Sequence, residues 1–363
     1  MKTMGVTAIL LVILSFGFID PNLPYLRNAL TSIVYGKPVV AAVLYIVILI
    51  MFYVGYTLTL RAYEDKRKKR MPRWIVGIVF LLLLSYPAFS HDIFNYILTA
   101  KLTFFYQENP YVVMPIEILN EPMLAFTRAA NKLALYGPTW IILTVFPYLA
   151  GLNNVLASIF SFKIFVAAFY SGFTYLIYRK TKDIRQTLFF ALNPLVLIET
   201  LVSGHNDIVM MTLAIAGLML WERKDMRYKA TGVVLFVSSI LVKGATIVLL
   251  PLFFFPTWKW EKKVVWGYWL MFLVFLLSPL REEMYPWYAV WWLAFAAFIP
   301  VKKNSVIHGF SYWLTFGLML RYVPWIATRE YGGITPLVRE VVTLVPVGIY
   351  IFIHHVWRRF SLR

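Results

Sequence analysis

Apolar runs long enough to cross a lipid bilayer recur along this chain and are separated by short polar stretches. A helix needs about 20 apolar residues to cross roughly 30 Å of hydrocarbon. Of the 363 residues, 61% are hydrophobic and 14% are charged, whereas about a quarter of the residues of a soluble domain are charged. The sequence therefore predicts an all-α polytopic transmembrane helical bundle of about 12 spans in one domain, residues 1–363.

The basic residues are arranged in clusters between the apolar runs, and they account for the formal charge of +18. A nucleic-acid-binding protein would instead collect them on one solvated face, so we expect membrane lipids and no nucleic acid as partners. The chain has no cysteine, which excludes disulfides, Cys-ligated zinc and thiol catalysis. No small-residue cleavage site follows the apolar run 4–19, so we expect this run to remain as the first helix.

The segment 61–73 sets the orientation, because it holds seven basic residues and two acidic ones and positively charged loops stay in the cytoplasm. This places both termini in the cytoplasm of a plasma-membrane protein and residues 90–92 at the outer surface. The predicted crossings are 4–19, 38–60, 74–90, 155–178, 186–202, 207–221, the two arms of 230–256, 264–279, 287–300, 305–320 and 336–356. They divide into two N-terminal helices (4–60), a catalytic module (about 74–300) and C-terminal helices (305–357).

Two stretches do not read as simple spans. The run 139–152 is only 14 residues long, which favours a re-entrant or juxtamembrane helix in the outer loop. Residues 230–256 contain Lys243, so they form either one span with a buried lysine or a hairpin with Lys243 at its outer tip. We favour the hairpin because an unpaired buried ammonium is costly.

With this topology, ionisable side chains collect on the outer face of the membrane. Asp92 is the leading candidate for a catalytic residue, although it could equally be a solvated carboxylate or the N-cap of the next helix. His205 and Asp207 could form the polar tip of a turn, or bind a sugar or metal together with His91 and Asp92. Lys243 and Arg281 either reach lipid phosphates or bind a substrate phosphate. No ligand spacing typical of a metal site is present, so no cofactor is predicted.

Five segments in fixed order resemble the GT-C class of membrane glycosyltransferases, most closely the polyprenyl-phosphate-mannose-dependent mannosyltransferases of bacteria and archaea. They span Ser90 to Leu293 and are HDIFNYILTAKLTFFYQENPYVVMP, LYGPTW, ALNPLVLIETLVSGHND, LVKGATIVLLP and YPWYAVWWL. The resemblance implies a GT-C-like fold and an inverting transfer of a hexose, expected to be mannose. The donor would be a polyprenyl (dolichyl) phosphate sugar, and the acceptor a glycolipid or glycan on the extracytoplasmic face.

The resemblance also implies roles for individual residues. Asp92 would be the general base on the acceptor hydroxyl, and Lys243 with Arg281 or Arg321 would stabilise the leaving phosphate. The predicted substrate-binding residues are His91, Tyr96, Glu108, Asn109, Tyr136, His205, Asn206, Asp207, Lys243, Arg281, Tyr288 and Arg321. No nucleotide-binding glycine loop is present, in keeping with a donor that is not a sugar nucleotide.

Two other classes of protein remain open. A flippase or transporter of a lipid-linked sugar would share the basic and aromatic lining, but it would place ionisable groups near the bilayer midplane. Their concentration on one face favours the enzyme. A membrane scaffold would make the polar cluster dispensable.

Overall fold

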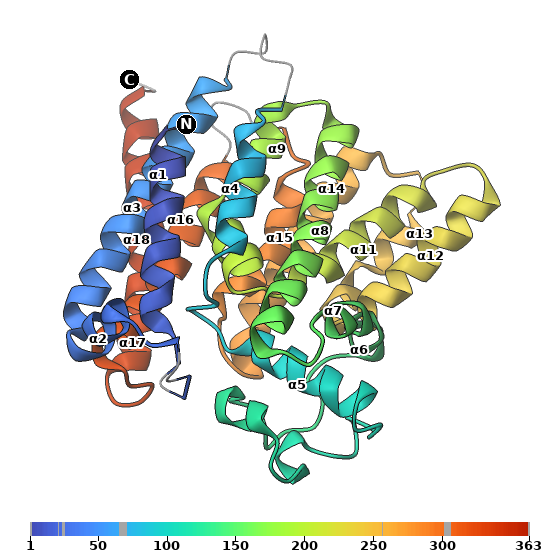
Figure 1. Cartoon of the computed structure of the whole chain (residues 1–363). Coiled ribbons are helices and arrows are strands. Elements are labelled where there is room, and N and C mark those ends of the chain that lie inside the picture. The colour runs from blue at the N-terminus through green and yellow to red at the C-terminus, as the bar shows by residue number, and fades with distance from the viewer. Residues whose placement is uncertain are drawn as a thin grey trace.

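The computed structural model describes residues 2–20, 22–23, 26–64, 71–255, 257–300 and 306–361, with side chains described as far as His354. Within these ranges every regular element is helical, which confirms the all-α class (Figure 1). The α-helices are α1 (Lys2–Ser15), α2 (Ala29–Gly36), α3 (Pro38–Ala62), α4 (Trp74–Leu83), α5 (Asp92–Phe104), α6 (Pro138–Leu143), α7 (Val145–Ala150), α8 (Val155–Thr181), α9 (Ile184–Ala191), α10 (Pro194–Leu197), α11 (Asp207–Trp221), α12 (Met226–Ile240), α13 (Pro251–Phe254), α14 (Trp260–Leu277), α15 (Ala289–Ala296), α16 (Val306–Leu320), α17 (Tyr322–Thr328) and α18 (Thr335–Ser361). Shorter turns are the 3₁₀-helices η1 (Phe16–Phe18), η3 (Pro115–Glu117), η4 (Pro122–Phe126), η6 (Gly244–Leu249), η7 (Ser278–Leu280) and η8 (Pro286–Tyr288), and the π-helix η5 (Ile198–Val202).

By length and composition, four of the described helices can cross a membrane: Pro38–Ala62, Val155–Thr181, Trp260–Leu280 and Thr335–His354. If the bent pair of helices Ile184–Ala191 and Pro194–Val202 forms one span, the number of candidate spans rises to five. Their outward faces are apolar; Val39 and Val43 of α3, for example, are 63% and 53% exposed. Such surface is stable only against lipid, and the chain is accordingly a helical membrane protein. About twelve spans were predicted, and the remaining crossings would have to use shorter helices.

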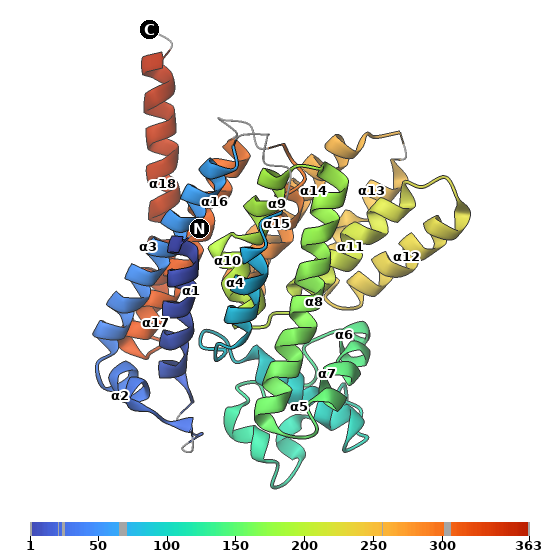
Figure 2. The same cartoon turned by 45° about the horizontal axis from the view of Figure 1, so that its top comes forward.

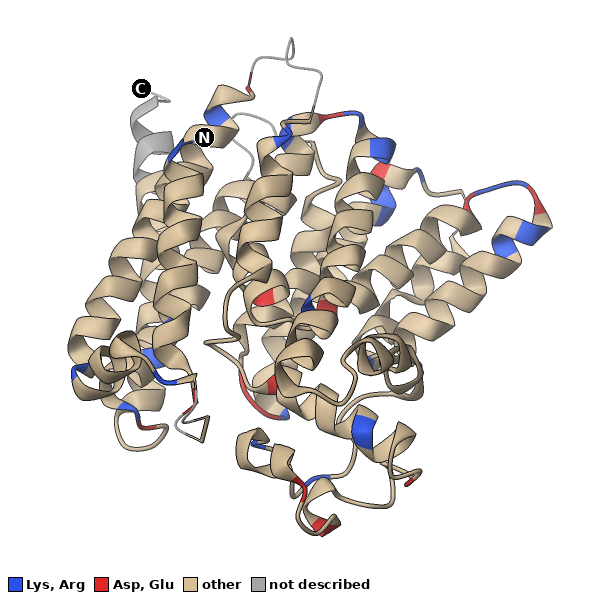
Figure 3. Ribbon diagram, viewed as in Figure 1, with Lys and Arg blue, Asp and Glu red and all other residues tan. Residues whose placement is uncertain are grey.

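Lys and Arg outnumber Asp and Glu most clearly in the loops at one end of the bundle, the end at which α1 begins (Figures 1 and 3). These loops include the end of α8 with Arg179 and Lys180, the α11–α12 connection, and the start of α14. The middle of the basic segment used to predict the orientation, residues 65–70, lies outside the described residues. The opposite end carries α2, α5, α6, α7 and α17 (Figures 1 and 2). We call it the outer end after the orientation that the sequence predicts for it.

Two predicted helices are shorter than expected, and proline is the reason in both. The predicted helix 74–90 ends at Leu83, and the chain then runs without regular structure to Asp92 because Pro87 cannot continue a helix. The predicted helix 186–202 is interrupted at Leu192 and Asn193, before Pro194, and its two halves meet at 54°. Both corrections place irregular backbone inside the bundle, where polar groups can line a site.

Of the two other unusual stretches, one forms the predicted hairpin, and the re-entrant or juxtamembrane placement of the other stays a prediction. Residues 139–152 form two short helices, α6 and α7, which lie with α5 at the outer end (Figure 2). Residues 230–256 form the hairpin, with α12 as one arm, η6 and α13 as the other, and Lys243 in the turn between them. The hairpin packs on α11, where Gly217 and Gly232 face each other; a Cβ on Gly217 would lie 2.7 Å from the Gly232 carbonyl oxygen.

The N-terminal helices pack against the C-terminal ones through α3. Helix α1 lies along α3, and α3 in turn contacts α16 and α17. The Tyr45 hydroxyl on α3 donates a hydrogen bond of 2.9 Å to the carbonyl oxygen of Met319. The N-terminal helices are therefore joined to the C-terminal ones.

Candidate functional site

Asp92 is the first residue of α5, at the end of the irregular stretch that follows α4. Its backbone N–H donates to Ser90 Oγ at 3.1 Å. The N-cap of α5 is His91, so the interpretation of Asp92 as the N-cap is wrong. In the first turn of a helix a carboxylate faces the positive end of the helix dipole, which favours its ionised form. The side chain of Asp92 remains 24% exposed and can meet a substrate.

Lys163, on α8, holds the irregular stretch in place. Its buried ammonium group donates to the carbonyl oxygens of Leu82 and Ser85 and, at 2.9 Å, to Ser85 Oγ. Carbonyl groups at a helix C-terminus lack intrahelical partners and carry partial negative charge. Lys163 therefore supplies hydrogen bonds to carbonyl groups at the C-terminus of α4. It also fixes the direction from which the chain reaches Asp92.

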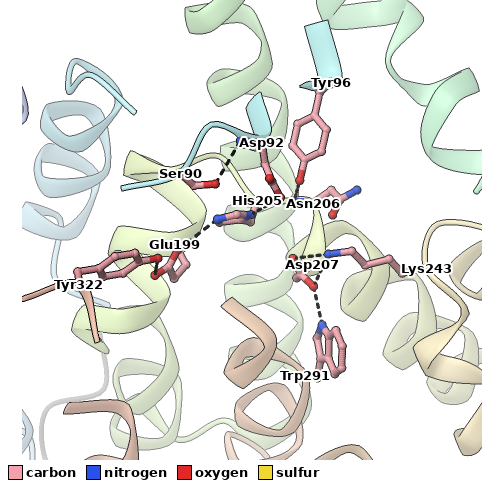
Figure 4. Close-up of polar contacts among 10 residues, drawn as sticks. All are labelled: Ser90, Asp92, Tyr96, Glu199, His205, Asn206, Asp207, Lys243, Trp291 and Tyr322. Atoms are coloured by element: carbon pink, nitrogen blue, oxygen red, sulfur yellow. Dashed lines mark hydrogen bonds and ion pairs between the residues drawn. The ribbon is translucent and has the colours of Figure 1, made fainter. Parts of the chain in front are cut away.

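His205 lies between two carboxylates in the loop before α11 (Figure 4). Its Nδ1 is 3.4 Å from Asp92 Oδ2, and its Nε2 is 3.3 Å from Glu199 Oε2. Both His205 and Glu199 are fully buried, and Glu199 Oε1 accepts a hydrogen bond of 2.8 Å from the Tyr322 hydroxyl. A row of polar groups thus runs from the buried Tyr322 to the partly exposed Asp92.

These contacts set the protonation states of His205 and Asp92. Burial opposes protonation of His205, but the neighbouring carboxylates of Asp92 and Glu199 outweigh it and raise its pKa to about 9. Burial also opposes ionisation of Asp92, yet its pKa is lowered by His205, by the charge of Lys243 and by the Tyr136 hydroxyl. At neutral pH the pair is therefore an imidazolium and a carboxylate.

Asp207, the first residue of α11, binds Lys243 from the turn of the hairpin. The Lys243 ammonium lies 3.0 Å from both carboxylate oxygens of Asp207, and Trp291 Nε1 donates to Asp207 Oδ1 at 2.6 Å. The ammonium also lies 5.3 Å from the ring centroid of Tyr288. The Lys243 side chain is 16% exposed, whereas Asp207 is buried, so only the cation of this pair reaches open space.

Asn206 places an unsatisfied amide between these two ion pairs (Figure 4). Its backbone N–H lies 3.4 Å from the Tyr96 hydroxyl oxygen and donates to it. Its side-chain oxygen and nitrogen are both buried, and neither has a hydrogen-bond partner among the described residues. A buried amide without partners is costly, so this amide is suited to bind a polar ligand.

Aromatic rings line one side of the cluster. His205 stacks on Trp287 with ring centroids 4.1 Å apart, and Trp287 stacks on Tyr285 at 4.4 Å. The Tyr96 ring meets Tyr136 edge-on at 4.8 Å. The polar cluster therefore packs against the aromatic rings of Tyr285, Trp287 and Tyr288.

The structure brings together seven of the predicted residues with Asp92: Tyr96, Tyr136, His205, Asn206, Asp207, Lys243 and Tyr288. The others lie elsewhere. His91 Nε2 faces Asp20 Oδ2 at 3.5 Å. Glu108, Asn109 and Arg281 are exposed, the first two in the loop after α5 and the last after η7.

Arg321 is 1% exposed and is held by two carboxylates, with NH2 2.8 Å from Glu283 Oε1 and NH1 2.9 Å from Glu340 Oε1. The sequence predicts that Arg321 can stabilise a phosphate. In the structure these two carboxylates neutralise its guanidinium group, so Arg321 is not a free cation.

Sequence reasoning missed Glu199, Trp291 and Tyr322. A signal for Glu199 was present, since it is the one carboxylate in the apolar stretch 186–202 and an acid within a membrane helix is costly unless it is used. No comparable signal marks Trp291 and Tyr322, which look like ordinary interfacial aromatic residues. In the part of the chain that the structure describes, no three His, Asp or Glu side chains are placed to hold a metal ion.

Comparison with known proteins gives two matches. The family described as "Alpha-(1->6)-mannopyranosyltransferase, N-terminal domain" matches residues 2–259. Alpha-(1->6)-mannopyranosyltransferase A of Mycobacterium tuberculosis is 28% identical over 195 residues, which are 49% of this chain and 34% of that protein. The match thus spans about a third of the relative's length. No solved structure matches the chain.

Proposed function

The chain belongs to the alpha-(1->6)-mannopyranosyltransferase family, and from this we propose that it is an inverting glycosyltransferase that transfers mannose from a polyprenyl phosphate to a lipid-linked or glycan acceptor. The observation that carries the proposal is the placement of Asp92. Its carboxylate is ionised, partly exposed and held by a buried His205 among polar and aromatic side chains. A general base in an inverting transfer needs these properties.

The proposed reaction is a single displacement. Asp92 takes the proton of the acceptor hydroxyl, whose oxygen forms a bond to the anomeric carbon of mannose. The bond from that carbon to the phosphate oxygen breaks, and the phosphate leaves on its polyprenyl chain. His205 keeps Asp92 ionised and oriented, while Glu199 and Tyr322 hold His205 from behind. Asn206 offers its buried amide to a sugar hydroxyl.

Lys243 is the cation that we propose for the leaving phosphate. Positive charge aimed at a developing anion is worth most in a site with little water. The cluster contains the carboxylates of Asp92, Glu199 and Asp207 but only two cations, His205 and Lys243. In the absence of a donor Lys243 is neutralised by Asp207, and we propose that the phosphate shares it. Arg281 and Arg321 have no part in this scheme.

We also propose that the site faces away from the cytoplasm in a bundle of twelve crossings. Support comes from the gathering of basic loops at the end opposite α5 (Figure 3), since such loops are retained in the cytoplasm. The shorter helices, including α1, α4 and α11, would complete the crossings as pieces of broken spans. The donor's lipid tail would then lie against apolar helix faces.

The test is a transfer assay with purified protein, polyprenyl-phosphate mannose and mannose-bearing glycolipid acceptors. Replacing Asp92 by Asn removes the base but little volume, so we expect transfer to fall about 10²–10⁴-fold, together with some loss of thermal stability because buried His205 loses a carboxylate partner. Asp225→Asn is the control, because Asp225 is exposed at the start of α12 and asparagine also caps helices. Equal turnover by wild type and Asp92→Asn would remove Asp92 from the mechanism. Transport of a lipid-linked sugar without transfer would favour the flippase.

A further inference from the structure

Beyond the cluster around Asp92, a cavity opens at the outer end of the bundle. It has a volume of about 410 Å³ and is lined by Glu282, Glu283, Tyr331, Pro336, Leu337, Arg339 and Glu340. These residues come from the connection between η7 and η8, from the connection between α17 and α18, and from the start of α18. On the basis of the transferase function proposed above, we infer that this cavity binds the sugar portion of the acceptor, an uncharged glycan rich in hydroxyl groups.

Ion pairs hold the cavity in shape. Glu283 Oε1 lies 2.8 Å from both Arg321 NH2 and Arg339 NH1, and Glu340 Oε1 lies 2.9 Å from Arg321 NH1. Arg321 is almost completely buried behind the cavity. A buried guanidinium paired on two sides fixes the positions of its partners, so the cavity is built before a ligand arrives.

The cavity offers both hydrogen-bond acceptors and donors. The carboxylates of Glu282, Glu283 and Glu340 and the guanidinium group of Arg339 line it, and the charges of Arg128 and Arg329 also act on Tyr331. Sugar hydroxyls can donate to the carboxylates and accept from the guanidinium group. Lys243, the proposed partner of the donor's phosphate, lies in the cluster around Asp92 and does not line this cavity. Donor and acceptor would therefore occupy separate sites.

Hydrogen-bonding capacity and apolar surface remain available in the cavity. The side-chain carboxylate of Glu282 is exposed and takes no part in the ion pairs found among the described residues. The buried Nε atom of Arg339 has no hydrogen-bond partner within the same ranges. Tyr331 and Leu337 are 57% and 63% exposed and offer apolar surface to the C–H faces of a sugar ring. This mixture of charged acceptors and apolar walls suits a glycan.

The cavity adjoins the proposed base through stacked rings. Tyr285 follows Glu282 and Glu283 closely in the chain and stacks on Trp287, which stacks on His205 beside Asp92. Burial, together with the charges of Glu282, Glu283 and Asp92, raises the pKa of Tyr285 to about 12, so its hydroxyl stays a donor. Tyr285 therefore lies within electrostatic reach of both places, as an acceptor that spans them requires.

The experiment compares the KM for acceptor with the KM for donor in Glu282→Gln and Tyr331→Ala. Removing a charged hydrogen-bond partner, or the exposed ring, should raise the acceptor KM about tenfold and leave the donor KM unchanged. Glu330→Gln is the matched control, since Glu330 is exposed next to Tyr331 but does not line the cavity. An unchanged acceptor KM in both variants would overturn the inference.

Direct binding separates this inference from the proposed function. Equilibrium dialysis with a radiolabelled, lipid-free oligomannoside should show saturable binding to wild type and Glu330→Gln, and at least tenfold weaker binding to Tyr331→Ala. If wild type transfers mannose but both variants keep the acceptor KM, the cavity assignment fails and the transferase stands. If no transfer occurs yet the variants lose oligomannoside binding, the cavity assignment stands and the transferase fails. Loss of both readouts in wild type would reject both.

Discussion

His205 is held between two carboxylates, and this position ties the stability of the protein to pH. Its pKa is about 9 in the folded protein, against about 6.5 in an unfolded chain. Because the folded value is the higher one, the stabilisation from its protonation is fully present below about pH 6.5 and is lost as the pH rises through about 9.

We therefore expect the difference in thermal midpoint between wild type and His205→Gln to shrink between pH 6.5 and pH 10. The measurement is intrinsic tryptophan fluorescence during heating in detergent, with both proteins at each pH, so that titration of other groups cancels. A difference that is constant or grows with pH would show that His205 is not an imidazolium in the folded protein.

The residues of the site differ in how far sequence could predict them. Asp92, Asp207 and Lys243 are polar residues at the ends of apolar runs, where the run itself draws attention to them. Tyr322 reaches Glu199 across 123 positions of sequence, and nothing local to either residue encodes that partner. Arg321 shows the converse, since its charge is visible in the sequence but the carboxylates that neutralise it are not.

At the scale of elements, the contact between α11 and α12 supports the position of Asp207. The two helices approach so closely at Gly217 and Gly232 that Gly217→Ala would place a methyl group 2.7 Å from a carbonyl oxygen. We expect this change to lower stability by about 1–3 kcal/mol. Gly172→Ala on α8 is the matched control; its added Cβ meets nothing within 4 Å, so stability should hold or rise by up to about 1 kcal/mol. Equal midpoints in thermal unfolding would mean that α11 and α12 can move apart freely.

Lys163 supports the early end of α4 in the same way. Lys163→Met keeps the length of the side chain but leaves the carbonyl oxygen of Ser85 without its Lys163 donor, whereas the carbonyl oxygen of Leu82 still accepts from Ser85. We expect a loss of about 1–3 kcal/mol, together with slower mannose transfer because the chain leading to Asp92 is released. Lys37→Met, at an exposed lysine, should match wild type in both thermal unfolding and transfer. Wild-type behaviour of Lys163→Met would show that α5 holds Asp92 without this support.

Sequence predicted the helical elements better than their ends. Hydropathy located α3, α8 and α14 because a long apolar run has few other stable forms in lipid. The predictions for 74–90 and 186–202 extended too far because they gave Pro87 and Pro194 too little weight, and the breaks create the irregular backbone near the site. The hairpin at Lys243 was predicted correctly from the cost of burying an ammonium group.

For the whole molecule, the proposed orientation can be tested directly because the chain has no native cysteine. Leu119 is 86% exposed at the outer end, and Met226 is 73% exposed beside the basic α11–α12 loop. A membrane-impermeant maleimide should label Leu119→Cys in intact cells but label Met226→Cys only after permeabilisation. The reverse pattern would place the site in the cytoplasm.

The match to the family ends at residue 259, yet Trp291 and Tyr322 supply hydrogen bonds to Asp207 and Glu199. During synthesis these two acids emerge from the ribosome well before the residues that bind them. A nascent chain that has inserted only α1 to α11 therefore holds acidic groups in the bilayer without their final donors, and insertion of the last helices completes their neutralisation. Premature termination before Tyr322 should leave a product prone to removal by quality-control proteases.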